Sequence, residues 1–295
     1  MNNMFDLNAI PAIQRSPGDY RLLKRIPWTS ESASFPFHPV EPIGDEMSVV
    51  WIDTETTGFS VGQDVIIELG MVKGRVSPST GQVTAITAMV SMYEDPGFEI
   101  PEVITKITGI TQDMVAGQRI DPVNVIAWFD DDPIVVAHNA RFDRGMFEAR
   151  FTGLDRLRWA CSIKDIPWSH YGFESSKLEY LLLKLGFFYE GHRASIDALA
   201  TAFLMHTVPK ATRQLIENEK SARVKLDAIG SPFAVKDDLK ARGYRWDGDA
   251  KVWHTEISQD DLDEELAFLS MTYFQGGHRA RQTTLSSRER YKVTK

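Results

Sequence analysis

The chain has 295 residues, 43% of them hydrophobic and 11% aromatic, and its formal net charge is −8. This length favours about two globular domains, and the apolar content excludes a disordered chain. The negative charge argues against a protein that holds nucleic acid mainly through a broad basic face, but not against an enzyme that meets phosphates through metal ions.

The sequence also indicates the cellular compartment and whether the chain contacts a membrane. No apolar run reaches the ~18 residues needed to span a bilayer, so we expect no membrane contact. The first twenty residues lack the basic and apolar regions of a secretory signal. The single cysteine, Cys161, excludes an intramolecular disulfide and is typical of a buried small apolar residue in a reducing compartment. The sequence therefore predicts a cytoplasmic protein.

Residues 1–46 form the first predicted segment. Proline, serine and acidic residues are scattered through it. We expect a mostly irregular N-terminal arm that packs on or tethers the next domain, with one short helix at residues 19–26.

Residues 47–212 have the pattern of an α/β domain. Apolar, β-branched segments at 48–52, 65–76 and 81–93 predict a strand meander, and the first is apolar enough to be a central strand. Further strands at 133–140 and 159–163 alternate with helical patterns. Those helical patterns lie at 101–117, which is broken in its middle, and at 121–131, 141–151, 178–186 and 193–208. The order predicts one mixed sheet with helices on its faces.

Residues 213–273 predict a small α+β accessory module. A strand at 224–230 and a helix at 231–243 precede a β-hairpin at 244–257 with an Asp-Gly turn, and a last helix covers 261–271. We expect Trp246 and Trp253 to supply much of its core. Two roles stay open: a surface for single-stranded nucleic acid, or a structural or protein-contact unit.

Residues 274–295 hold six Lys or Arg and one Glu. This composition predicts a basic flexible tail, either solvated or gripping nucleic acid. Its Gln282–Leu285 stretch weakly resembles the peptides that bind sliding clamps, so a polymerase or clamp contact through the C-terminal region is a further prediction.

Carboxylates gather where predicted strands end and helices begin. Asp53 and Glu55 point to the same side of a strand because they are two positions apart. Alone, such a pair is also typical of a solvated strand end. Two carboxylates aimed at one point repel each other unless a cation lies between them. With Asp143 and Asp197, they predict a four-carboxylate site for two divalent ions, and such hard oxygen ligands favour Mg²⁺ or Mn²⁺.

His192 lies five residues before Asp197. On one continuous helix the two would be separated by about 140° and would not share a face. If His192 instead lies on the loop entering the helix, after Gly191, both reach the same site. A neutral imidazole there is suited to remove a proton from water. The alternative is an ordinary loop histidine.

Three segments in order carry a family resemblance: DTETTG (53–58), AHNARFD (137–143) and HRASID (192–197). They resemble the motifs of the DEDDh exonuclease superfamily, which includes the proofreading epsilon subunit of bacterial DNA polymerase III. The segment ITGIT (107–111) is similar to the substrate-lining segment of that superfamily, although it can equally be a helix break. The resemblance covers residues 47–208.

The resemblance implies a ribonuclease-H-like fold and 3′→5′ exonucleolysis with two divalent ions. Asp53, Glu55 and Asp197 would hold the ion that activates water. Asp53 would also hold the second ion, with Asp143 ligating it directly or through water, and His192 would be the base. The residues implied to line the substrate are Thr56, Thr57, Gly58, Phe59, Thr108, Gly109, Ile110, Asn139 and Phe142.

Three functions remain open at this point. The first is release of nucleoside 5′-monophosphates from the 3′ ends of nucleic acid, with single-stranded DNA favoured. The second is an exoribonuclease that trims small RNAs, because the metal ions contact the phosphate and not the sugar. The third is a recruitment module with vestigial catalysis. Rejection of a 2′-OH by the pocket separates the first two.

Overall fold

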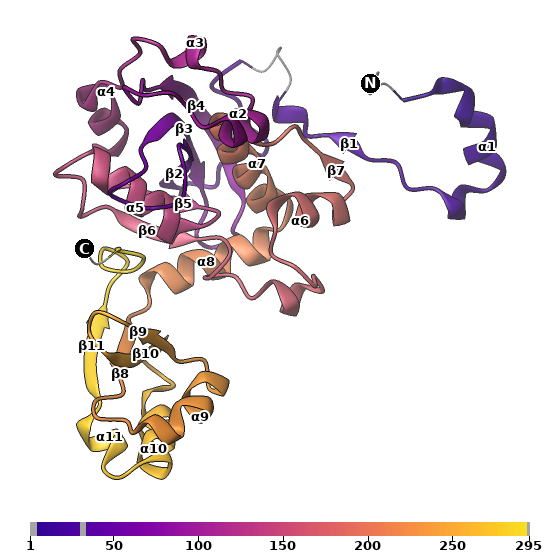
Figure 1. The fold of residues 1–295 in the computed structure, drawn as a ribbon. Coiled ribbons are helices and arrows are strands. Elements are labelled where there is room, and N and C mark those ends of the chain that lie inside the picture. Colours follow the sequence, from indigo (N-terminus) through magenta and orange to yellow (C-terminus); the bar gives the residue numbers. More distant parts are fainter. Residues whose placement is uncertain (1–4, 30–33, 294–295) are drawn as a thin grey trace.

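The computed structural model describes residues 5–29 and 34–293, which form a large N-terminal domain and a smaller C-terminal module (Figure 1). The domain is built on a five-stranded sheet of order β4-β3-β2-β5-β6. β2, β3 and β4 are antiparallel, whereas β5 and β6 run parallel to β2. The strands are β2 Met47–Thr56, β3 Ile66–Val76, β4 Val83–Tyr93, β5 Ile134–Ala137 and β6 Arg158–Cys161. The predicted ribonuclease-H-like mixed sheet is confirmed.

The helices of the domain cover both faces of this sheet. They are α2 Glu102–Thr108, α3 Gln112–Val115, α4 Pro122–Ile126, α5 Ala140–Arg150, α6 Leu178–Lys184, α7 Ala194–Thr207 and α8 Pro209–Lys220, with 3-10 turns η4 Ala127–Phe129 and η5 Trp168–Tyr171. α8 spans the domain boundary expected between residues 212 and 213.

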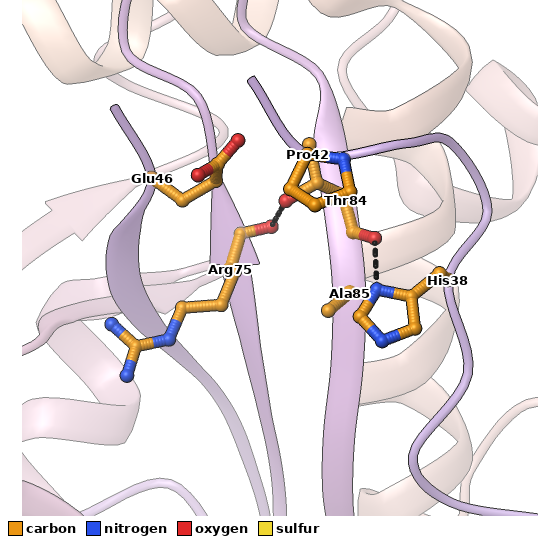
Figure 2. A pocket seen from close by; sticks show the side chains of 6 residues that line it. All are labelled: His38, Pro42, Glu46, Arg75, Thr84 and Ala85. Atoms are coloured by element: carbon orange, nitrogen blue, oxygen red, sulfur yellow. Dashed lines mark hydrogen bonds between the residues drawn. The ribbon is translucent and has the colours of Figure 1, made fainter. Parts of the chain in front are cut away.

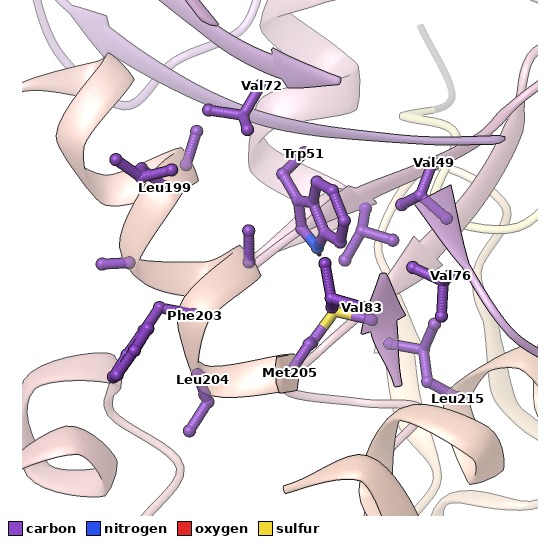
Figure 3. Packing of buried hydrophobic residues seen from close by; sticks show 14 of the residues in the cluster. Val49, Trp51, Val72, Val76, Val83, Leu199, Phe203, Leu204, Met205 and Leu215 are labelled. Atoms are coloured by element: carbon purple, nitrogen blue, oxygen red, sulfur yellow. Dashed lines mark hydrogen bonds between the residues drawn. The ribbon is translucent and has the colours of Figure 1, made fainter. Parts of the chain in front are cut away.

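Neighbouring residues of β2 pack into the two hydrophobic cores on opposite faces of the sheet. Trp51 lies in the core on the α7 side of the sheet, and Ile52 lies in the core under α5. Figure 3 shows Trp51 between Val72 of β3 and Met205 of α7. Its indole N–H donates to the Met205 Sδ at 3.0 Å. Burial on both faces explains why residues 49–52 are all apolar.

The N-terminal arm is extended, and its first part reaches away from the domain (Figure 1). Its elements are η1 Leu7–Ala9, α1 Ile10–Arg15, η2 Pro17–Asp19, β1 Lys24–Arg25 and η3 Pro27–Thr29. The helix expected at residues 19–26 was wrong, because β1 pairs in parallel with β7 Phe187–Phe188. Residues 1–4 and 30–33 of the predicted arm lie outside the described residues.

The C-terminal module has a four-stranded antiparallel sheet of order β11-β8-β10-β9. Its core contains Leu239, Tyr244 and Leu269, with Trp253 packed against them. Trp246 is 53% exposed because it lies on the edge strand β9, so its expected place in the core was wrong. The elements are β8 Arg223–Asp227, η6 Phe233–Val235, α9 Lys236–Ala241, β9 Arg245–Asp247, β10 Val252–Ser258, α10 Leu262–Thr272, α11 Gly276–Arg279 and β11 Arg281–Leu285.

The segment expected to be a flexible basic tail is structured over residues 276–285. Its Gln282–Leu285 stretch forms most of β11, which pairs with β8, and is therefore not a free peptide. Residues 286–293 then return to the large domain, where Arg290 is 1% exposed. The prediction of a flexible tail was wrong for these residues because their partners are mostly backbone carbonyls, which composition does not reveal. Residues 294 and 295 lie outside the described residues.

Cys161 is buried, as predicted. Within residues 5–29 and 34–293, no helix has the length and apolar character that crossing a membrane requires.

Candidate active site

Three carboxylates converge at the end of β2. Asp53 and Glu55 come from β2 and Asp197 from the first turn of α7. One ligand atom from each lies within 4.8 Å of the other two, and all three residues are half-buried. Strand period two aims Asp53 and Glu55 to the same side, as the sequence predicts.

Gly70 of β3 brings α7 to this point. It is the Cα partner of Asp53 across the sheet, so both face the α7 side. A Cβ built on Gly70 would lie 2.1 Å from backbone atoms of Ala194 and Ser195. The absence of a side chain therefore lets the first turn of α7 rest on the sheet and carry Asp197 to Asp53.

Asp143 reaches the site from the other side, in the first turn of α5. β5 pairs with β2 only along residues 49–51, so the backbone of β2 beyond that point needs other partners. Asp143 supplies one, because its Oδ1 accepts from the Thr54 amide at 3.1 Å and from the Thr54 hydroxyl at 3.0 Å. Asp143 is 3% exposed and lies outside the three-carboxylate cluster, although its charge acts on Asp53.

The carboxylates hold protons far more strongly than free acids. Burial raises the pKa of Glu55 to about 8, and the charge of Asp197 contributes. Burial raises the pKa of Asp143 to about 7, against the hydrogen bonds from Thr54. The pKa values of Asp53 and Asp197 are also raised by burial. A site that penalises several negative charges in this way fits divalent cations with oxygen ligands.

His192 lies on the loop before α7, as predicted, with a positive φ of 65° and an exposed side chain. Its neighbour Arg193 fastens this loop to the sheet. The Arg193 Nε donates to Oε2 of the buried Glu68 at 3.2 Å, and its guanidinium also contacts the Tyr93 hydroxyl. The loop that presents the imidazole is therefore anchored, and the imidazole itself is exposed.

Residues 50–205 match the RNase_T exonuclease family, a span that covers just over half of the 295 residues. The chain belongs to this exonuclease family. The acid cluster and the fold agree with the DEDDh resemblance of the sequence motifs.

The exonuclease is similar to parts of much longer curated proteins. It is 33% identical over 233 residues to the DNA polymerase III PolC-type of Listeria innocua, covering 75% of this chain and 15% of that protein. Its identity to the DNA polymerase III PolC-type of Clostridium perfringens is 36% over 171 residues, covering 56% of this chain and 11% of that protein. A solved structure of exonuclease X in complex with 5′ overhanging duplex DNA is 24% identical with a TM-score of 0.44, and the match covers 58% of this chain and 98% of that one.

The first group of residues predicted to line the substrate lies at the end of β2 and in the turn that follows it. The Thr56 hydroxyl donates to the Gly58 carbonyl, and the Thr57 hydroxyl donates to Asp64 at 3.1 Å. A Cβ on Gly58 would lie 2.6 Å from the Asp64 carboxyl group. Phe59 is 81% exposed. The turn is thus held from within and presents one large aromatic ring to solvent.

The second group lies on α5. Phe142 is partly buried against the core on the α5 side, and its ring centroid is 6.1 Å from that of Phe59. Asn139 occupies the N-cap position of α5 and is exposed. Both therefore lie within one helical turn of Asp143, as the motif order implies.

The third group forms the turn after α2. Gly109 has a φ of 71° and is exposed, whereas Thr108 and Ile110 are buried. The Thr108 hydroxyl accepts from the Ile110 amide at 3.0 Å and donates to the Ile104 carbonyl at 2.9 Å. The helix break considered from the sequence is present, and the buried side chains of Thr108 and Ile110 serve its packing.

Two residues of the site had no signal in the sequence reasoning. The Tyr189 hydroxyl donates to Oδ1 of Asp197 at 2.9 Å and so orients a predicted metal ligand. Glu68 lies opposite Glu55 in the sheet and accepts from Arg193 and from the Ala194 amide. Arg193 lies within the HRASID motif, but its partner is 125 residues away in sequence.

His138 differs from His192 in chemistry, although both lie in quoted motifs. Its Nε2 donates to the Ser176 carbonyl at 2.7 Å, and its Nδ1 lies 2.7 Å from the Ser162 hydroxyl. Burial lowers the pKa of His138 to about 4, so it is neutral and held on both sides at pH 7. It therefore has a structural role.

A separate hollow lies at the outer edge of the sheet, between β3, β4 and residues 38–46 (Figure 2). It is lined by His38, Pro42, Glu46, Arg75, Thr84 and Ala85. The His38 ring nitrogen Nδ1 lies 3.2 Å from the Thr84 carbonyl. None of the predicted site residues lines this hollow.

Gly70 yields a direct test of how the exonuclease brings Asp197 to Asp53. Gly70→Ala is expected to lower the free energy of unfolding by about 1–3 kcal/mol and to reduce the turnover number, because the new methyl group forces α7 off the sheet. Urea unfolding and nuclease assays measure the two effects. Gly248→Ala is the matched control, since a Cβ there meets nothing within 4 Å. Equal behaviour of the two variants would contradict the role assigned to Gly70.

Proposed function

We propose that this exonuclease hydrolyses phosphodiester bonds from the 3′ end of single-stranded DNA and releases nucleoside 5′-monophosphates. The observation that carries the proposal is the convergence of Asp53, Glu55 and Asp197 within 4.8 Å, in a setting that raises their pKa values. In the absence of metal these carboxylate charges repel one another, and divalent cations that bind between them stabilise the charged forms.

Asp53, Glu55 and Asp197 would hold one divalent ion, and Asp53 and Asp143 a second, with Mg²⁺ or Mn²⁺ as the ions that suit oxygen ligands. Such ions supply a lowered pKa for the attacking water and neutralisation of charge on the phosphate. The chain itself orients these ligands. Thr54 fixes Asp143, and Tyr189 with the Arg193 amide fixes Asp197.

His192 would accept the proton of the attacking water, because it is the exposed imidazole beside the cluster. Phe59, exposed above the turn and near Phe142, would stack on the terminal base. Thr57 and Gly58 would let the terminal sugar approach the backbone of the turn, which Asp64 holds rigid.

DNA is proposed over RNA because the curated relatives that the chain resembles are DNA polymerases of the PolC type. The chain covers 15% of the Listeria innocua protein, so the polymerase activity of that relative is not carried over to these residues. We infer a role in trimming DNA 3′ ends during replication or repair, in contact with a polymerase. Contact through the C-terminal region and a cytoplasmic location stay predictions from the sequence.

Digestion of end-labelled oligonucleotides tests the proposal. Wild-type protein with Mg²⁺ or Mn²⁺ is expected to release labelled mononucleotide at once from a 3′-labelled strand and to shorten a 5′-labelled strand stepwise. Glu55→Ala is the matched inactive control. Immediate mononucleotide release from the 5′ label would instead show the opposite polarity.

Matched RNA and DNA oligonucleotides of one sequence separate the two sugar classes. A faster rate on DNA supports the proposal, and a faster rate on RNA assigns the chain to the exoribonucleases. If the wild type releases no more mononucleotide from either substrate than Glu55→Ala does, the proposed activity is wrong. The chain is then a recruitment module with vestigial catalysis.

A further inference from the structure

Residues 286–293, here called the strap, return from the module and lie against the large domain beside β6. β11 ends at Leu285, and the Trp159 amide of β6 then donates to the Ser287 carbonyl at 3.0 Å. β6 is the edge strand of the five-stranded sheet, so the strap satisfies a backbone group that would otherwise be unpaired. The Ser287 hydroxyl also donates to the buried Glu219 at 2.6 Å.

The strap is bound at its centre by a buried side chain of α5. Arg144 is fully buried, and its guanidinium donates to the carbonyls of Arg288 and Arg290. The same guanidinium donates to the Asp155 carbonyl at 3.1 Å, and its Nε donates to Glu148 at 2.6 Å. A planar guanidinium can hold several carbonyl groups at fixed angles, which a lysine cannot.

The last described residues of the strap contact Asp165, which follows β6, and Gly145 of α5. The Tyr291 hydroxyl donates to Oδ1 of the buried Asp165 at 2.6 Å. A Cβ on Gly145 would lie 2.8 Å from a methyl group of Val293 and 2.9 Å from one of Val61. Val293 and Val61 therefore pack directly on α5, and Val61 belongs to the turn that carries Phe59.

Arg144 and Gly145, two of the strap contacts on α5, directly follow Asp143 in sequence. A third, Arg141, lies two residues before it and donates to the Lys292 carbonyl at 3.4 Å. Asp143 is fixed on its other side by the amide and hydroxyl of Thr54. Its distance from the three-carboxylate cluster therefore depends on where the first turn of α5 lies. We propose that the strap positions Asp143 for metal binding, with Arg144 as its anchor in α5. This rests on the proposed two-ion function.

The test uses the full chain and measures Mn²⁺ binding calorimetrically without nucleic acid, together with the thermal midpoint and the turnover number. Arg144→Lys is expected to weaken the weaker of two Mn²⁺ sites by about 10- to 100-fold, as loss of a group that orients a ligand does. The turnover number at low Mn²⁺ falls and recovers at high Mn²⁺. Arg150→Lys is the matched control, because this arginine lies on the same helix but binds Glu94 and Ile120.

Asp143→Asn completes a double-mutant cycle. It is expected to remove the same weak Mn²⁺ site, and Arg144→Lys is expected to have no further effect on Mn²⁺ binding in that background. If Arg144→Lys does not fold, Tyr291→Phe replaces it in the test. This variant is expected to weaken Mn²⁺ binding at the same site by a smaller factor.

The outcomes distinguish a failure of the strap proposal from a failure of the two-ion function on which it rests. If Arg144→Lys lowers the thermal midpoint but leaves the Mn²⁺ affinity unchanged, the proposal that the strap positions Asp143 is wrong, whereas the proposed nuclease function stands. Equal loss of both Mn²⁺ sites, or the same loss in Arg150→Lys, also overturns it. If the wild type binds fewer than two Mn²⁺ ions, the two-ion function is wrong and the strap proposal falls with it.

Discussion

Asp53→Asn is expected to reduce the exonuclease rate by at least about a thousandfold and to raise the thermal midpoint of the metal-free protein at pH 8. Asp53 is the carboxylate whose pKa burial and the charges of Asp143, Asp197 and Glu55 raise well above its ordinary value. Its charge is therefore unfavourable to the fold and is useful only when cations are present. An amide of the same shape removes the charge and weakens cation binding.

Differential scanning fluorimetry in a chelating buffer and single-turnover digestion measure these two opposite changes. Asp113→Asn, at an exposed position of α3, is the control and is expected to change neither. A stable, active Asp53→Asn protein would exclude Asp53 from the metal site. A destabilised, inactive one would show that its carboxylate has a structural partner.

The second large effect is a stability that falls as the pH rises in the metal-free protein. Glu55 has a pKa of about 8 and Asp143 of about 7 in the folded state, whereas unfolded carboxyl groups titrate near about 4. Between these limits the folded state binds more protons than the unfolded state, so the free energy of unfolding decreases with pH. This contribution is complete below the unfolded pKa values and is lost as the pH passes about 8.

The informative range is pH 6.5 to 8.5, because the lowered pKa of His138 acts in the opposite direction below about 6.5. Urea unfolding in chelating buffer is expected to show a loss of roughly 1 kcal/mol per pH unit. Saturating Mg²⁺ should flatten or reverse the slope, since cations stabilise the charged carboxylates. Glu55→Gln should flatten it without metal. A slope that is the same with and without Mg²⁺ would refute a metal site at these carboxylates.

Local pattern and motif order were sufficient to locate the four candidate carboxylates. The spacing of Asp53 and Glu55 follows from strand period alone, and the motifs placed Asp143 and Asp197 on the correct helices. The role of Glu68 could not be read in the same way. It is one of many acids on a strand, and its meaning depends on Arg193, a residue 125 positions away that only folding brings near.

The strap was missed for a related reason. Six basic residues against one acid indicate a solvated tail, because side-chain charge is what composition reports. The contacts that hold the strap join Arg144 to the backbone carbonyls of Arg288 and Arg290. Because every residue has such a carbonyl, the side chains of the strap give no sign of this contact. The exposure of Trp246 likewise depends on strand order, which places β9 at the edge of the module's sheet.

The two ends of the module lie opposite each other, since Arg223 at the start of β8 is the Cα partner of Leu285 at the end of β11. Along the chain the module therefore lies between two segments that both contact the large domain, α8 before it and the strap after it. A stop codon placed before β8 would delete the strap together with the module. Joining Ala222 to Ser286 through a short linker would excise the module alone and leave Arg144 with its carbonyl partners. The two deletions, which look alike on a linear map, therefore produce different enzymes.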